Sequence, residues 1–153
     1  MKSVPSTNLR ESVRSFDSRS AEETESIGRA LATLLPATGI VLLIGELGAG
    51  KTALTKGILD GRGLARPEDV ASPTFTLIHE YGEPVRAYHI DLYRLETADE
   101  ARRLGLEDLF EEPALVLIEW GDRFPELLPA DRIEIRLQHT GENSRHIEVF
   151  AIA

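Results

Sequence analysis

One segment constrains this sequence more than any other: residues 45–52 read GELGAGKT. The segment fits the phosphate-loop pattern of a glycine, four residues, and then glycine, lysine and threonine. An apolar run at residues 40–44 precedes it, and residues 53–59 follow with a helical pattern. Because the motif needs a strand before it and a helix after it, this context predicts a nucleotide-binding loop rather than a chance glycine-rich turn.

The residue types of this loop suit a triphosphate. Its glycines let the backbone curl so that N–H groups point inward at a phosphate, and the start of the following helix adds partial positive charge. The lysine can reach the β- and γ-phosphates, and the threonine hydroxyl can bind Mg²⁺. We therefore predict that the nucleotide contacts the whole loop: Gly45, Glu46, Leu47, Gly48, Ala49, Gly50, Lys51 and Thr52.

The absence of a guanine-recognition segment predicts which base the bound nucleotide carries. Most GTP-binding domains read guanine with an Asn-Lys-x-Asp segment, and the sequence after the loop contains none. Adenine is therefore the expected base, and ATP with Mg²⁺ the expected ligands.

Hydrophobic periodicity predicts an α/β fold of the P-loop NTPase type. The expected mixed sheet has a parallel core, antiparallel hairpins, and helices on both faces. At 153 residues, one domain over 1–153 is expected, with residues 1–8 as a loose tail. Helices are expected at 21–35, opened by a Ser20/Glu23 capping box, at 53–59, and at 98–104 with an extension past Gly105 to Phe110. Strands are expected at 9–16, at 40–44, in the second half of 72–81, and at 85–91, 114–118, 132–137 and 146–150.

Composition narrows the class of partner. The net charge of −9 argues against this chain alone gripping a nucleic-acid backbone, which needs Lys and Arg to neutralise phosphates. The sequence has no cysteine, which excludes disulfides and thiolate metal sites. No apolar run approaches the ~20 residues of a membrane span, and the N-terminus lacks an apolar stretch of the signal-peptide type. We expect a cytoplasmic protein without a membrane partner.

Acidic residues in the second half are candidates for the metal side of the site. Mg²⁺ held by Thr52 needs a carboxylate opposite, and Glu119 directly follows the apolar run 114–118, where a ligand crevice would lie. An aspartate is usual there. Glu119 is predicted to bind the metal or orient the attacking water, the alternative being a surface carboxylate. Asp91, at the end of 85–91, is the second metal candidate, acting through water, or else a turn cap.

Three further features allow two interpretations each. Thr74 either senses the γ-phosphate, as switch loops do, or is an ordinary turn residue. Trp120, the one tryptophan, packs near the nucleotide or a partner, although core filling is the favoured interpretation. The four histidines have no metal-site spacing and are interpreted as structural or surface residues.

Four segments together resemble one family. GELGAGKT, SPTFTLIHEY, YHIDLYRL and LIEWGDR, in this order and spacing, resemble TsaE (formerly YjeE), a small bacterial ATPase of tRNA threonylcarbamoyladenosine biosynthesis. The resemblance implies slow ATP hydrolysis alone and action with two partner proteins, TsaB and TsaD. It implies that TsaD modifies the adenosine beside the anticodon in tRNAs that read codons starting with A, so that tRNA is met only indirectly.

The resemblance also assigns residues. It implies that residues 45–52 bind ATP and that Thr52 and Glu119 occupy the Mg²⁺ positions. Asp91 lies in the family's Asp-Leu-Tyr-Arg motif, and Ser20 and Arg145 match places where family members touch the nucleotide. Lys51, Glu119 and Asp91 are the expected catalytic residues.

Two rival functions use the same loop. A small-molecule kinase would need an acceptor pocket and an arginine-bearing lid, for which Arg102 and Arg103 are the candidates. A binding module would sense ATP without hydrolysing it. Transfer of phosphate to a metabolite would favour the first rival, and tight binding without turnover the second.

Overall fold

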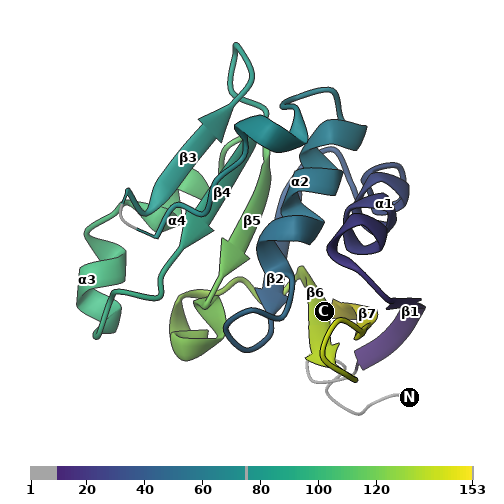
Figure 1. Cartoon of the computed structure of the whole chain (residues 1–153). Helices are drawn as coiled ribbons and strands as arrows, with labels where there is room; N and C mark the ends of the chain where they lie inside the picture. Colours follow the sequence, from purple (N-terminus) through teal and green to yellow (C-terminus); the bar gives the residue numbers. More distant parts are fainter. Residues whose placement is uncertain (1–9, 75, 153) are drawn as a thin grey trace, which may run out of the picture.

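A single seven-stranded sheet organises the chain (Figure 1). The computed structural model describes residues 10–74 and 76–152, and the strand order is β1-β7-β6-β2-β5-β4-β3. The strands are β1 (Arg10–Ser18), β2 (Gly39–Ile44), β3 (Ile78–Tyr81), β4 (Ala87–Asp91), β5 (Leu115–Glu119), β6 (Arg132–His139) and β7 (Arg145–Ile152). The helices are α1 (Ala21–Ala32), α2 (Lys51–Gly61), α3 (Ala98–Arg102) and α4 (Leu106–Leu109), with 3₁₀ turns η2 (Pro67–Asp69), η3 (Gly121–Arg123) and η4 (Pro125–Leu127).

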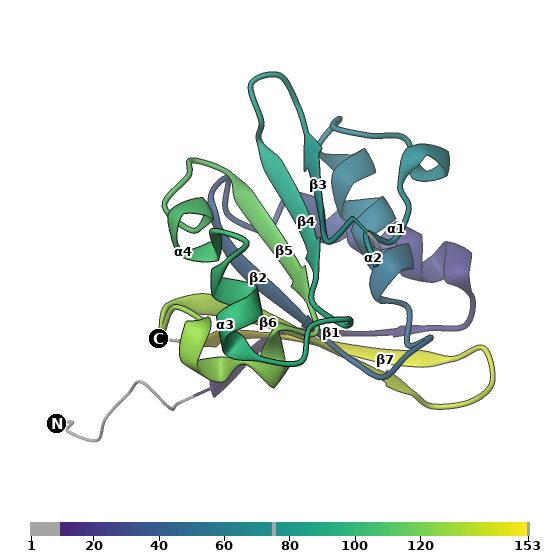
Figure 2. The same cartoon turned by 90° about the vertical axis from the view of Figure 1, so that its left-hand side faces the viewer.

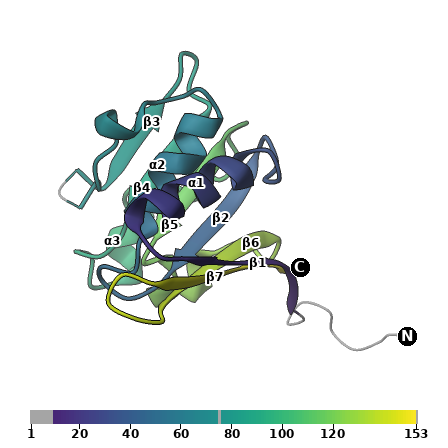
Figure 3. The same ribbon diagram turned by 45° about the vertical axis from the view of Figure 1, so that its right-hand side comes forward.

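The middle of the sheet is parallel. β6, β2, β5 and β4 pair in parallel, while β3 and the β1–β7–β6 edge pair antiparallel (Figure 3). Every residue of β5 is buried, as expected of an uninterrupted apolar run covered on both faces. The predicted mixed α/β fold of the P-loop type is thereby confirmed.

Two apolar clusters lie on opposite faces of the sheet. One joins α1 and α2 to the sheet through Leu31, Leu54 and Ile58. The other joins α3 and α4 to it through Ala101 and Leu106. Figure 2 shows these two pairs of helices on either side of the strands, so helices flank both faces as predicted. Within the described residues, no helix is both long and apolar enough to cross a membrane.

Close contact between α1 and α2 depends on glycines, and Gly57 and Gly28 show this most clearly. A Cβ added at Gly57 would lie 2.0 Å from the Glu25 carbonyl oxygen, and one at Gly28 would lie 2.4 Å from the Leu54 carbonyl oxygen. Since real Cβ contacts under 3.0 Å are essentially never seen, the backbones approach as only glycine allows. This approach fixes α2, whose first residues belong to the phosphate loop.

Several element boundaries differ from the predictions. The first predicted strand runs to Ser18, and its predicted start at Leu9 falls outside the described residues, as does the 1–8 tail. The strand predicted at 85–91 begins at Ala87, because a turn closed by Arg86 N–H to the Tyr81 carbonyl occupies the preceding residues.

Helix ends differ as well. The helix predicted at 21–35 ends at Ala32 with Thr33 as its C-cap. The helix predicted from 98 divides at Gly105, whose φ of 79° is left-handed. The helix predicted at 53–59 is longer and begins at Lys51.

Candidate functional site

The phosphate loop sits where four parallel strands end. β2 leads into it, and β4, β5 and β6 finish at the same edge of the sheet. Gly45 passes so close to β6 that an added Cβ would lie 2.9 Å from the Leu137 carbonyl oxygen. Gly50, the N-cap of α2, has a φ of 103° and makes no side-chain cap hydrogen bond. Because glycine has no side chain that could cap them, the first N–H groups of α2 suit an anion.

Lys51 lies inside the loop that it belongs to. Lys51 is 5% exposed, and its Nζ donates hydrogen bonds to the Gly45 carbonyl and, at 3.2 Å, to the Glu46 carbonyl. The same Nζ is 3.9 Å from the centroid of the Trp120 ring. Burial lowers the pKa of Lys51, and the nearby carboxylates, with Glu119 the largest contributor, offset the effect in part. The ammonium group thus lies within the loop, between the loop carbonyls and the face of Trp120.

The strand-end hollow brings most of the predicted site residues together. It has a volume of about 420 Å³ and lies between the loop, β4 and β5. Predicted site residues line it from four separate segments of the chain. The lining comprises Leu47, Gly48, Gly50, Lys51, Thr52, Ala53, Ser72, Thr74, Asp91, Tyr93, Glu119 and Trp120.

Asp91 has both of its carboxylate oxygens engaged. Oδ2 accepts hydrogen bonds from Ser72 Oγ at 3.1 Å and Thr74 Oγ1 at 3.0 Å. Oδ1 accepts from the Tyr93 N–H at 2.9 Å. Both interpretations of Asp91 therefore have support, because it caps the following turn and also lines the hollow. Thr74 also lines the hollow, and its hydroxyl group is hydrogen-bonded to Asp91.

Glu119 is a buried carboxylate paired with a histidine. It is 3% exposed, which excludes the alternative of a surface carboxylate. Its Oε2 lies 2.6 Å from Nε2 of His89, a residue with 0% exposure in the middle of β4. The hydrogen bond uses one carboxylate oxygen and leaves the other for a ligand.

Ser20 and Arg145 meet on the other side of the loop. The α1 hollow, of about 190 Å³, is lined by Ser20, Ala21, Thr24, Gly48, Gly50, Ala53, Asn143 and Arg145. Arg145 donates from Nε to the Ala49 carbonyl and from an Nη to the Gly48 carbonyl, both at 3.1 Å. Ser20 is the N-cap of α1, as predicted, and accepts from the Glu23 N–H. Arg145 thus joins β7 to the phosphate loop.

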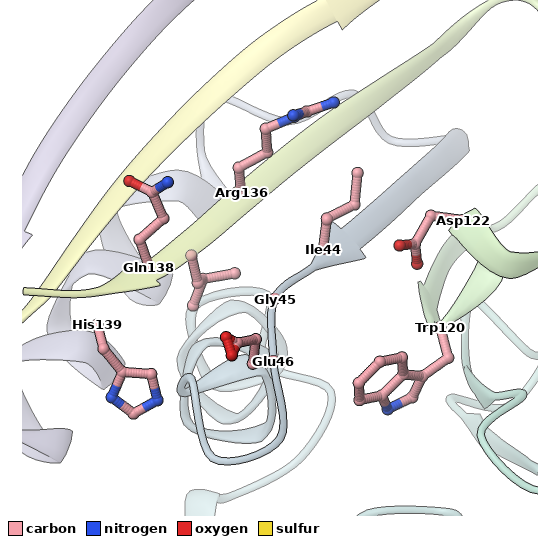
Figure 4. A pocket seen from close by; sticks show the side chains of 9 residues that line it. Ile44, Gly45, Glu46, Trp120, Asp122, Arg136, Gln138 and His139 are labelled. Atoms are coloured by element: carbon pink, nitrogen blue, oxygen red, sulfur yellow. The ribbon is translucent and has the colours of Figure 1, made fainter.

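A third cavity, the β6 hollow, flanks the start of the loop (Figure 4). It measures about 570 Å³ and is lined by Ile44, Gly45, Glu46, Trp120, Asp122, Arg136, Leu137, Gln138 and His139. Figure 4 shows Trp120 and Asp122 on one side of Gly45, with Gln138 and His139 on the other. Trp120 lines both this cavity and the strand-end hollow and is half-buried. The favoured interpretation of core filling therefore describes only part of its surroundings.

Sequence reasoning missed some of these neighbours. His89 was interpreted as merely structural, yet it contacts Glu119. Residues 89 and 91 lie on one face of β4, beside residues 117 and 119 of β5, and this register is not encoded in either segment alone. Arg102 and Arg103, the candidate kinase lid, line none of the three hollows.

The oxygen donors in the strand-end hollow suit a Mg²⁺ ion that is coordinated partly by protein side chains and partly by phosphate oxygens. Among the described residues, no group of three or more His, Cys, Asp or Glu forms a metal cluster. The hollow has the Thr52 hydroxyl and the Glu119 and Asp91 carboxylates. Mg²⁺ commonly binds one or two carboxylates together with substrate phosphates, so a small oxygen set suffices.

Comparison with known proteins gives one consistent result. The family profile described as "Threonylcarbamoyl adenosine biosynthesis protein TsaE" matches residues 18–147. The chain is 40% identical over 132 residues to tRNA threonylcarbamoyladenosine biosynthesis protein TsaE of Bacillus subtilis, covering 86% of this chain and 81% of that protein. It is 44% identical over 133 residues to the protein of the same name from Nostoc, covering 84% and 80%.

A solved structure agrees with the sequence comparisons. A crystal structure of Bacillus subtilis YdiB superimposes with a TM-score of 0.78 at 31% identity, covering 95% of this chain and 89% of that one. The profile match and these relatives span most of the chain. The chain therefore belongs to the TsaE family, which acts in tRNA threonylcarbamoyladenosine biosynthesis.

Proposed function

We propose that this protein binds ATP with Mg²⁺ and hydrolyses it while working with TsaB and TsaD in the threonylcarbamoylation of adenosine beside the tRNA anticodon. The observation that carries the proposal is the strand-end hollow, where Lys51, Thr52, Asp91 and Glu119 converge from the loop, β4 and β5. The choice of pathway rests on membership of the TsaE family. We expect the protein to hydrolyse ATP in the cytoplasm.

The residues of the loop bind the triphosphate. Backbone N–H groups at the start of α2 face the phosphates, and Lys51 exchanges its carbonyl partners for phosphate oxygens. ATP extends towards the α1 hollow, where Ser20 and Arg145 contact the nucleotide. This path uses the two hollows that share Gly48, Gly50 and Ala53.

Residues of the strand-end hollow support hydrolysis. Thr52 and Glu119 would hold Mg²⁺, and Asp91 lies nearby to act through a water. When bound, Mg²⁺ neutralises charge on the β- and γ-phosphates. Lys51 stabilises the charge that develops on the γ-phosphate as water attacks it and the bond to the bridging oxygen breaks. The products are ADP and phosphate.

Charge and exposure support action beside a partner rather than on tRNA. The net charge of −9 opposes direct binding to a phosphate backbone. Leu47, at the tip of the loop, is 72% exposed although it lines the strand-end hollow. We expect a partner that docks at the loop to cover this side chain.

ATP turnover with and without TsaB and TsaD tests this proposal. We expect stimulation by the partners, and Lys51→Ala to lower the stimulated rate by a factor on the order of 10²–10³, as loss of one charge-stabilising group does. Lys56→Ala, on the same helix but outside the three hollows, is the matched control and retains the parent rate. Equal rates for the parent and Lys51→Ala, without stimulation, would refute hydrolysis at this site.

A binding titration separates hydrolysis from mere sensing. At millimolar ATP and Mg²⁺ the parent should bind and Lys51→Ala should not. Binding without turnover in the full complex would favour an ATP-sensing module.

A further inference from the structure

His89 occupies an unusual position for a histidine. It lies in the middle of β4 with 0% exposure, surrounded on its face of the sheet by apolar residues such as Ala87 and Leu117. Strand register sets its direction: β4 and β5 are parallel, His89 pairs with Leu117, and Asp91 pairs with Glu119. Alternating side chains therefore place His89 on the same face as Glu119. The 2.6 Å contact between Nε2 and Oε2 follows from this arrangement.

We assign the ring hydrogen of His89 from this contact. An ionised carboxylate only accepts hydrogen bonds, so the bond to Glu119 requires hydrogen on Nε2. In the neutral ring, Nδ1 is then an acceptor. Nδ1 is buried, and within the described part of the chain it has no hydrogen-bond partner.

An unpartnered buried nitrogen needs an explanation. A leucine would fill the same apolar space and remove the unpartnered nitrogen, but it would leave the buried Glu119 carboxylate without this hydrogen-bond partner. The imidazole is thus suited to one task at this position, which is donation to Glu119. His89 lines none of the three hollows, so it can act on a ligand only through that carboxylate.

We propose that His89 is a positioning residue that fixes Glu119 for Mg²⁺. This role rests on the proposed function, in which Glu119 is a metal ligand. Donation from Nε2 immobilises Oε2 and directs Oε1 to the strand-end hollow. Outer hydrogen bonds of this kind orient ligating carboxylates, and their loss typically lowers metal affinity or activity about 10–100-fold.

Three variants test the role. His89→Leu removes the donor, whereas His89→Gln keeps an N–H donor at a comparable distance from the backbone. His79→Leu is the matched control, because His79 pairs with His89 on the neighbouring strand β3 and its ring contacts Thr76 rather than the site. Each is assayed with the stimulating partners for kcat, for KM of ATP and for the Mg²⁺ concentration that gives half-maximal rate.

A selective effect on the metal step is expected. His89→Leu should lower kcat or raise the Mg²⁺ requirement about 10–100-fold, with KM for ATP changed by less than about 3-fold, because the loop still binds phosphates. His89→Gln should recover most of the loss, and His79→Leu should match the parent. Equal losses in His89→Leu and His89→Gln that follow a common fall in melting temperature would show a purely structural role and overturn the proposal.

A spectroscopic measurement on the unmutated protein keeps the test independent of folding. ¹⁵N NMR of the histidine rings should show His89 with hydrogen on Nε2, and this signal should shift in Glu119→Gln. Hydrogen on Nδ1 alone would overturn the proposal. If the parent hydrolyses ATP and loses activity in Lys51→Ala while His89→Leu keeps full rate, only the positioning role fails. A parent without turnover refutes the proposed function and this role with it.

Discussion

Replacement of Gly57 by alanine is the most informative test of how the fold holds the phosphate loop. A Cβ at this position would lie 2.0 Å from the Glu25 carbonyl oxygen and 2.9 Å from the Cα of Gly28. Neither atom belongs to a flexible side chain. The methyl group can therefore be accommodated only if α1 and α2 move apart.

The expected cost comes from that movement. Ordinary contact begins at 3.4 Å, so the helices must separate by about 1.4 Å, the difference between 3.4 and 2.0 Å. Overpacking of this kind costs about 1–3 kcal/mol, and separation also loosens Leu31, Leu54 and Ile58, which are each at most 1% exposed. Alanine returns about 0.5–1 kcal/mol through its better helix propensity. A net destabilisation of about 2 kcal/mol lowers the melting temperature by about 4–8 °C in a chain of this size.

Thermal unfolding followed by circular dichroism measures the shift. Gly141→Ala is the matched control, because Gly141 lies in an exposed turn and its added Cβ would be 3.6 Å from its nearest neighbours. The control should melt within about 2 °C of the parent, as expected of a surface change within about 0.5 kcal/mol. If Gly57→Ala melts at or above the parent temperature, the close packing of α1 on α2 is refuted.

Three other substitutions have defined outcomes. Lys51→Met should be more stable than the parent in urea at pH 7, because burial lowers the pKa of Lys51 and the charged lysine therefore destabilises the folded state; the difference shrinks as pH rises through the lowered pKa towards the ordinary value of 10.5. Arg145→Ala should weaken ATP binding about 10-fold in a titration, because two charge-assisted hydrogen bonds to the loop are lost. Glu134→Gln should cost about 2 kcal/mol in urea unfolding, as the loss of hydrogen bonds to charged groups does, since Glu134 is 2% exposed and contacts Arg132 at 2.8 Å and Arg136 at 3.1 Å.

The buried centre of the sheet could be predicted from the sequence because its signal is local. Residues 40–44 and 114–118 are uninterrupted apolar runs, and only a strand covered on both faces can bury such a run. They lie side by side as β2 and β5. The phosphate loop was equally accessible, because the positions of its glycines, lysine and threonine follow from the chemistry of a bound phosphate.

Pairing between distant segments could not be predicted in the same way. The alternation in 132–137 predicted a hairpin with β7, which is present, but it does not state that β6 also pairs in parallel with β2. β6 therefore has a neighbouring strand on each side although its sequence alternates. Glu134 is buried and contacts Arg132 and Arg136, which lie on the same face of β6. The contact of His89 with Glu119 likewise depends on the register of β4 and β5, which no single segment encodes.

Charged side chains that line the strand-end hollow already make hydrogen bonds within the protein, and a ligand must compete with these contacts. Lys51 Nζ is bonded to loop carbonyls and lies over Trp120, and Asp91 holds Ser72 and Thr74. On the proposed function, ATP and Mg²⁺ must replace these contacts, so only the difference between new and old interactions contributes to affinity. A partner protein that binds the exchanged state more tightly would raise ATP affinity, and ATP would raise the affinity for that partner by the same factor. ATP titrations with and without the partner measure this factor. Equal ATP affinities in the two titrations would show that the partner does not distinguish the two states.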